Sequence, residues 1–136
     1  MEFSINQLDH VAIRVKDMER SIEWYERVLG LKKVQFEKWG AFPIFMLSGK
    51  TGIALFPAKA EDPDVMKNSR NVKIDHFAFN VSPENFIKAR SKYDLLKIEY
   101  RFKDHHYFHS IYTFDPDGHE VELTTLVVQE DKVYDL

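Results

Sequence analysis

The stretch Ile74-Asp75-His76-Phe77-Ala78-Phe79-Asn80-Val81 decides the fold that this chain is expected to adopt. Apolar and other residues alternate along it with period two, which predicts a β-strand. The apolar residues lie on one face, and His76 shares the opposite face with Ala78 and Asn80. The same pattern occurs earlier, as Leu8-Asp9-His10-Val11-Ala12-Ile13-Arg14-Val15. Two strands with a histidine at the same point of one pattern indicate an internal repeat with a histidine pair.

The composition is that of one globular domain. Of the 136 residues, 44% are hydrophobic and 30% are charged, which is enough for a core without disulfides. The net charge of -3 gives no reason to expect nucleic acid or a membrane surface as a partner. The absence of cysteine excludes thiolate metal ligands and cysteine nucleophiles. Neither a signal-peptide pattern nor a membrane-spanning apolar stretch is visible, so a cytoplasmic location is the default expectation.

The first half of the chain predicts a β-α-β-β-β module over residues 5–57. After the first strand, Asp17 is placed to cap a helix, apolar residues recur at helical spacing, and Gly30 ends the helix. Strand-like pieces then follow over residues 31–39, 42–47 and 52–57. We expect the helix to cover the apolar face of the first strand.

The second half repeats the same order over residues 72–126, after a charged linker without periodicity at residues 58–71. Ser82 as N-cap and Pro83 at the first helical position predict the start of its helix. Strand-like pieces follow over residues 96–102, 108–114 and 119–126. The tail, residues 127–136, shows no pattern. The sequence therefore predicts a single α+β domain of two repeated modules with eight mostly antiparallel strands.

One carboxylate falls on the predicted face of the two histidines. Along residues 119–124 apolar residues alternate with Glu122 and Thr124, so these two face the way that His10 and His76 face. A lone strand histidine is usually structural, so a metal site depends on the two histidines and the carboxylate together. Two imidazoles and one carboxylate with open neighbouring positions suit Fe(II), and also Mn(II) or another divalent ion.

Three passages carry a family resemblance: residues 8–12 with 24–31, residues 74–79, and residues 110–123. They resemble the vicinal-oxygen-chelate superfamily, also called the glyoxalase/bleomycin-resistance/dioxygenase superfamily. The resemblance implies paired modules that curl into a half-open, mostly antiparallel barrel around a divalent metal. It also implies that His10, His76 and Glu122 are the metal ligands, that the substrate is a small molecule, and that the chain works as a homodimer.

Differences among members of the superfamily narrow the reaction. Ala54 stands where glyoxalase I enzymes bring a fourth ligand, and alanine cannot bind a metal. Bleomycin-binding members lack the ligands that this sequence retains. Extradiol dioxygenases and fosfomycin-modifying thiol transferases use the retained three-ligand set. A phosphonate substrate would call for basic residues near the site, and only Lys132 follows Glu122, so the dioxygenase reaction is favoured.

Residues with expected roles in an Fe(II)-dependent, extradiol-dioxygenase-like oxidation follow from the same resemblance. Tyr112 matches a tyrosine beside the metal, and Asp104-His105 resembles a loop whose histidine acts as acid or base. We therefore predict Tyr112 and His105 as catalytic residues. The residues predicted to line the substrate site are Phe42, Ile44, Met46, Phe56, Ser110 and Thr124. This largely apolar wall suits an aromatic or apolar substrate that binds through vicinal oxygens.

Two alternatives stay open beside the dioxygenase. A lyase, isomerase or thiol transferase could use the same ligands with Mn(II), Zn(II) or Ni(II). Sites of nitrogen and oxygen ligands follow a common order of affinity for divalent metals, so the ligand types alone do not identify the metal. A non-catalytic protein that binds an apolar ligand would carry the histidines without using them for metal.

Overall fold

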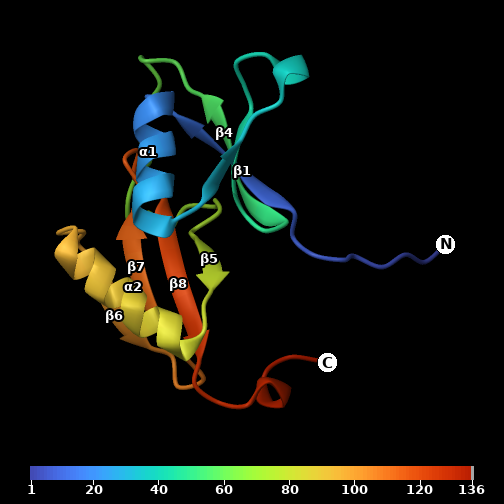
Figure 1. Ribbon diagram of the computed structural model, residues 1–136, viewed down its shortest axis with the longest axis vertical. Helices are drawn as coiled ribbons and strands as arrows, with labels where there is room; N and C mark the ends of the chain where they lie inside the picture. The colour runs from blue at the N-terminus through green and yellow to red at the C-terminus, as the bar shows by residue number, and fades with distance from the viewer. Residues whose placement is uncertain (136) are drawn as a thin grey trace. The chain divides into compact units, whose positions relative to one another are not determined.

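The computed structural model describes residues 1–135, whose helices and strands occur as two copies of one pattern (Figure 1). The elements of the first copy are β1 (His10–Val15), α1 (Met18–Leu29), β2 (Lys32–Val34), η1 (Glu37–Trp39), β3 (Ile44–Ser48) and β4 (Thr51–Pro57). Those of the second are β5 (Phe77–Asn80), α2 (Pro83–Leu95), β6 (Arg101–Asp104), β7 (Phe108–Phe114), β8 (Glu120–Leu126) and η2 (Glu130–Lys132). The predicted repeat of two β-α-β-β-β modules is confirmed.

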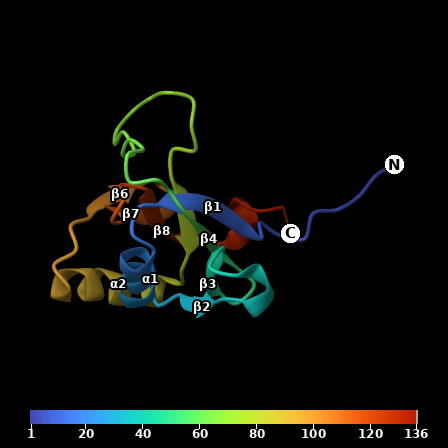
Figure 2. The same cartoon turned by 90° about the horizontal axis from the view of Figure 1, so that it is seen from above.

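The chain divides into two compact units, Met1–Pro63 and a second unit that begins at Asp64. Each unit holds one four-stranded sheet, with strand order β1-β4-β3-β2 in the first and β5-β8-β7-β6 in the second. The first and last strands of each module pair in parallel, as β1 and β4 do side by side in Figure 2, and the other pairs are antiparallel. The predicted α+β class with mostly antiparallel pairing is confirmed.

Helix α1 begins and ends where the sequence predicts. The Asp17 side chain accepts a hydrogen bond from the Arg20 backbone N–H, which would otherwise have no partner within the helix. Gly30 ends the helix in the left-handed conformation, at φ 67°, which glycine adopts without steric cost. The helix packs against β2, β3 and β4 of its own sheet and buries Tyr25 and Val28.

Helix α2 of the second unit also begins at a side-chain cap. The Ser82 hydroxyl accepts from the Asn85 backbone N–H at 3.1 Å, and Pro83 occupies the first turn. The helix packs against β8, and its buried residues Phe86 and Tyr93 join a core that includes Ile111 of β7. One face of each sheet is thereby covered by its own helix, which leaves the histidine-bearing face for other contacts.

Two predicted strands begin or end elsewhere than the sequence pattern suggests. The strand predicted over residues 31–39 ends at Val34, because the Gln35 amide donates to the carbonyls of Gly40 and Ala41 and closes a loop around η1. The strand predicted from residue 74 begins only at Phe77. Its partner β8 starts at Glu120, after a turn at residues 115–118, so no ladder continues further back.

The strand predicted from residue 96 also begins late, at Arg101. Helix α2 runs to Leu95, and Lys97 then takes the left-handed conformation at φ 58°, which ends the helix and delays the strand. Between β4 and β5, residues 58–76 form turns and bends without helix or strand. The tail is linked to β7 by a contact between the Phe108 and Tyr134 rings, with residue 136 outside the described residues. Within residues 1–135 no helix is long and apolar enough to cross a bilayer.

Candidate metal centre

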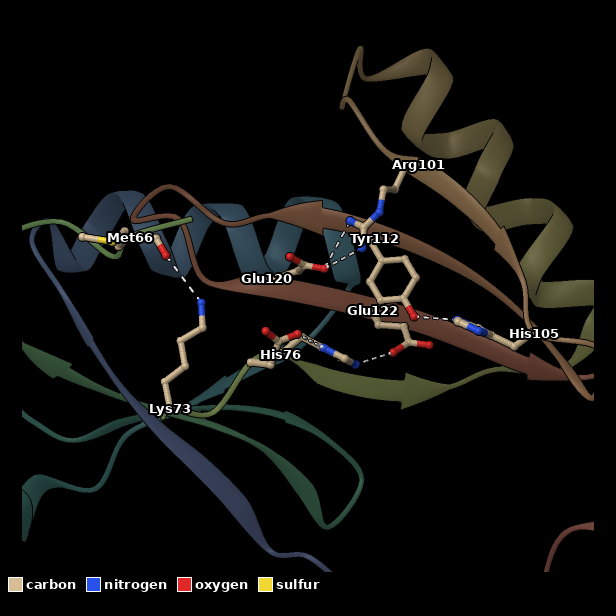
Figure 3. A network of polar contacts seen from close by, with 9 residues as sticks. Met66, Lys73, His76, Arg101, His105, Tyr112, Glu120 and Glu122 are labelled. Carbon is tan, nitrogen blue, oxygen red and sulfur yellow. Dashed lines mark hydrogen bonds and ion pairs between the residues drawn. The ribbon is translucent and has the colours of Figure 1, made fainter. Parts of the chain in front are cut away.

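His76 and Glu122 come together in the second unit. Glu122 lies opposite Ala78 in the β5–β8 ladder, and His76 stands two residues before Ala78, so both side chains lie on one face of the sheet. The distance from His76 Nε2 to Glu122 Oε1 is 2.9 Å (Figure 3). Two ligands that are each about 2.1 Å from an octahedral ion lie about 3 Å apart. The nitrogen and oxygen donors of this pair therefore fit a shared divalent ion.

Each of the predicted ligand histidines is oriented by the aspartate before it. His76 Nδ1 lies 2.8 Å from Asp75 Oδ2, and in the first unit His10 Nδ1 lies 2.7 Å from Asp9 Oδ2. The hydrogen bond from His76 is the main cause that lowers the pKa of Asp75, which keeps this carboxylate charged. When Nδ1 donates to a carboxylate, the Nε2 lone pair is left for a metal. Each module thus repeats the histidine together with the aspartate that orients it.

Replacing Asp75 with alanine is expected to weaken metal affinity about 10–100-fold, the usual cost of losing a partner that orients a ligand. The His76 ring would then be free to rotate and to exchange its tautomers. Calorimetric titration with Mn(II) measures the effect. Asp94→Ala removes the same charge from the end of α2 and should bind metal as the parent does. Equal affinity in the two variants would contradict a role for Asp75.

The third predicted ligand, His10, belongs to the other unit. Within each unit taken by itself, the described residues gather no group of three histidine, cysteine or acidic side chains that could hold a metal. The structure therefore brings His76 and Glu122 together, and their role as metal ligands with His10 stays a prediction.

Tyr112 lies beside this pair, on the same face. In the β7–β8 ladder Tyr112 is opposite Glu122, and its ring centroid is 5.5 Å from that of His76. The Tyr112 hydroxyl is 2.8 Å from His105 Nε2, so the two predicted catalytic residues contact each other (Figure 3). Burial, and then the charge of Glu122 and a hydrogen bond with it, raise the pKa of Tyr112 to about 12. Tyr112 therefore stays protonated at neutral pH and can donate a hydrogen bond.

Arg101 is a further residue at this site, which sequence reasoning missed. Its guanidinium carbon lies 4.3 Å from the centroid of the Tyr112 ring, and its Nη2 lies 3.1 Å from Glu120 Oε1 (Figure 3). Arg101 precedes Glu122 in sequence and reaches the site through the pairing of β6 with β7, where it lies opposite Tyr112. The predicted hairpin of these two strands could have indicated that Arg101 lies beside Tyr112.

Ser110 and Thr124 occupy the same face, further along the ladder. They are opposite each other in β7 and β8, and the Ser110 hydroxyl donates to Thr124 Oγ1 at 2.9 Å. Ser110 is fully buried. The structure places both predicted lining residues on the face that carries Glu122, and their contact with a substrate stays a prediction.

The prediction that Ile44 and Met46 line the site is wrong. In the β3–β4 ladder the residue opposite Ala54 is Phe45, and paired residues share a face. Ile44 and Met46 therefore point to the other face, where both are buried. Phe45 takes their place beside His10, with ring centroids 5.1 Å apart. A shift of one residue moves every side chain of a strand to the opposite face.

Phe56 and Phe42 were also predicted to line the site. Phe56 is opposite Arg14 in the parallel ladder of β1 and β4, so it lies on the face that carries His10. The Arg14 guanidinium carbon lies 5.1 Å from the centroid of the Phe56 ring. Phe42 precedes β3, is exposed, and has its ring 6.4 Å from that of Phe56. Their role in substrate binding stays a prediction.

Known proteins resemble this chain in both sequence and fold. The profile of the Glyoxalase/Bleomycin resistance protein/Dioxygenase superfamily matches residues 7–123. Metallothiol transferase FosB of Lysinibacillus sphaericus is 31% identical over 130 residues, which cover 93% of this chain and 87% of the relative. A glyoxalase/dioxygenase from Nostoc punctiforme has a similar fold, with a TM-score of 0.74, 22% identity, and coverage of 90% of this chain and 92% of that one.

A second solved structure is the fosfomycin resistance protein FosX from Mesorhizobium loti. Its TM-score is 0.68 at 24% identity, with coverage of 96% of this chain and all of that one. Its likeness shows the fold, while the relationship to FosB extends to sequence. By sequence and by fold, the chain belongs to the Glyoxalase/Bleomycin resistance protein/Dioxygenase superfamily.

Proposed function

We propose that this protein is a metal-dependent transferase that joins a thiol to a small anionic electrophile of the kind that fosfomycin represents. The observation that carries the proposal is the 31% identity, over 93% of this chain, to a metallothiol transferase. It favours the transferase alternative over the dioxygenase that the sequence pattern favoured.

Arg101 removes the objection that sequence analysis raised against a transferase. A phosphonate substrate calls for positive charge near the ligands, and the Arg101 guanidinium, which also pairs with Glu120, lies over the Tyr112 ring. Tyr112, protonated and beside Glu122, is placed to donate a hydrogen bond to an oxygen on which charge develops. These two residues can hold and orient an anionic substrate.

His76 and Glu122, with His10 as the expected third ligand, would hold the metal ion. When bound, a divalent ion would supply Lewis-acid polarisation of a substrate oxygen. The chain's own residues do the rest: Asp75 fixes the His76 ring, and Arg101 offers a positive charge for the substrate.

The experiment is a search for the adduct. Protein loaded separately with Mn(II), Fe(II), Zn(II) or Ni(II) is incubated with fosfomycin and either L-cysteine or glutathione. In the expected reaction a sulfur–carbon bond forms, an epoxide carbon–oxygen bond breaks, and the thiol proton ends on the released oxygen. Mass spectrometry should therefore find a product whose mass is the sum of both reactants. The absence of that product with every metal and both thiols would count against this substrate pair.

A dioxygenase is the second candidate, because Tyr112 and His105 form the contact that an acid or base beside the metal requires. Protein reconstituted with Fe(II) without oxygen, and then given oxygen and a series of catechols, would show ring-cleavage absorbance if this candidate is right. We expect no such absorbance from a preparation that forms the thiol adduct.

Replacing Tyr112 with phenylalanine is expected to keep the fold and the metal but to lower turnover about 100-fold. The change deletes a hydroxyl that donates a hydrogen bond and no ligand, and loss of one such donor typically costs about 10²–10³ in rate. His105→Ala should show a similar but smaller loss, since it acts through the same hydroxyl. Tyr107→Phe, which removes an exposed hydroxyl from the second unit, should be unaffected.

We also propose that the protein is a homodimer, as the superfamily resemblance implies. Residues 58–76, without helix or strand, would allow modules to be exchanged between chains. Sedimentation velocity at micromolar concentration should show a species of twice the chain mass. A monomer over that range would exclude this assembly.

A further inference from the structure

A row of aromatic rings extends from His10 on the face of the first sheet that α1 does not cover. We call Phe36, Trp39 and Phe45 the aromatic wall. Phe45 and His10 have ring centroids 5.1 Å apart, Phe45 and Trp39 5.2 Å, and Trp39 and Phe36 4.7 Å. The row therefore connects the predicted metal ligand with η1 through two intermediate contacts.

The outer rings of the aromatic wall are exposed in spite of their size. Phe36 is 51% exposed and Trp39 is 41% exposed. Large exposed apolar patches are uncommon on soluble proteins and usually mark a binding surface. Edge-to-face contacts, with interplanar angles of 76° and 68°, leave ring surfaces available for another planar group.

The loop that carries Phe36 and Trp39, the outer rings of the aromatic wall, is held by hydrogen bonds. The Gln35 amide donates to the Gly40 carbonyl at 3.2 Å and to the Ala41 carbonyl at 3.3 Å. The Trp39 N–H donates to the Phe36 carbonyl at 3.0 Å, which closes η1, the short teal helix in Figure 2. These contacts hold the backbone that carries the two outer rings, which reduces the entropy lost on binding.

From these observations we infer that the aromatic wall binds an aromatic or planar apolar group of the substrate, whose oxyanion lies beside His10. The inference rests on the proposed function, because it gives the wall a substrate that enters beside His10. It goes further by naming the substrate class: an anionic electrophile that carries an aromatic group, which a small aliphatic compound such as fosfomycin lacks.

The test compares two probes that share an oxyanion and differ only in the group attached to it. Calorimetry of Mn(II)-loaded protein is carried out with phenylphosphonate and with methylphosphonate. We expect the phenyl probe to bind at least about tenfold more tightly, since burial and stacking of one ring supply that much. Trp39→Ala should abolish the preference without changing the affinity for methylphosphonate, and Trp39→Phe should restore most of it.

Controls separate a binding role from a structural one. Phe3→Ala removes an aromatic side chain that is more exposed than Trp39 and has no place in the aromatic wall, and should keep the preference. Circular dichroism and sedimentation of Trp39→Ala should match the parent. Equal affinity for the two probes, binding of neither, an unchanged preference in Trp39→Ala, or a changed oligomeric state in that variant would overturn the inference.

The outcome is independent of the transferase reaction, because no thiol is present in the binding experiment. A strong preference for phenylphosphonate without any thiol adduct would keep the aromatic wall and remove the transferase. A thiol adduct with fosfomycin and no preference between the probes would do the reverse.

Discussion

Alanine at His76 is expected to weaken metal binding by more than about 100-fold. Loss of a residue that merely orients a ligand costs about 10–100-fold, and loss of a direct donor should cost more. His76 Nε2 and Glu122 Oε1 are 2.9 Å apart, so the loss of either atom removes one of the two ligand atoms that the second unit brings together. Glu122→Gln, which keeps the shape of a buried side chain, should give a similar loss. Titration with Mn(II), monitored by calorimetry, measures both.

The fold should survive these changes, because both side chains lie on the face away from α2. Matched controls are available on the same unit. His109 is opposite Thr125, on the other face of β7, and His109→Ala should bind metal as the parent does. Glu84→Ala removes an exposed carboxylate from the first turn of α2 and should also be neutral. Metal binding by His76→Ala at the parent level would show that the pair is not a metal site.

His10→Ala tests the remaining ligand separately. If His10 completes the set, this variant should lose metal as His76→Ala does. If it keeps metal, the centre consists of residues from the second unit alone, and the ligand role that the family resemblance implies for His10 is wrong.

Local chemistry explains which parts of the fold could be predicted. Asp17 and Ser82 each satisfy a backbone N–H at a helix start, and Gly30 supplies the left-handed residue at a helix end. These effects act within a few residues, so the sequence shows them directly. The repeated Asp-His pair was visible for the same reason, and its local hydrogen bond is what the structure adds.

Contacts between distant residues could not be predicted in the same way. Arg101 reaches Tyr112 only through the pairing of β6 and β7, and His105 reaches the same hydroxyl across the end of that hairpin. The bounds of the hairpin depend on Lys97, whose left-handed conformation delays β6. A sequence pattern with period two fixes which residues alternate, and leaves open which strand lies opposite.

The face of β3 is the clearest example. The predicted lining of the site placed Ile44 and Met46 on the face that carries Ala54, although the loop closed by Gln35 is longer than the turn between β6 and β7. The ladder instead places Phe45 there. The aromatic wall was missed as a consequence, because Phe45 was not among the residues predicted to line the site.

Alanine at Met46 is therefore expected to lower the free energy of unfolding by about 2–5 kcal/mol, as large-to-small substitutions in cores do. Met46 is fully buried on the face that α1 covers, so its loss leaves a cavity. Phe45→Ala removes a larger side chain but from the uncovered face, and should cost about 1 kcal/mol. Met46→Leu, which conserves volume, should cost less than about 1.5 kcal/mol. Urea denaturation of the three variants measures the order, and a larger loss for Phe45→Ala than for Met46→Ala would mean that β3 is paired one residue away from the register described here.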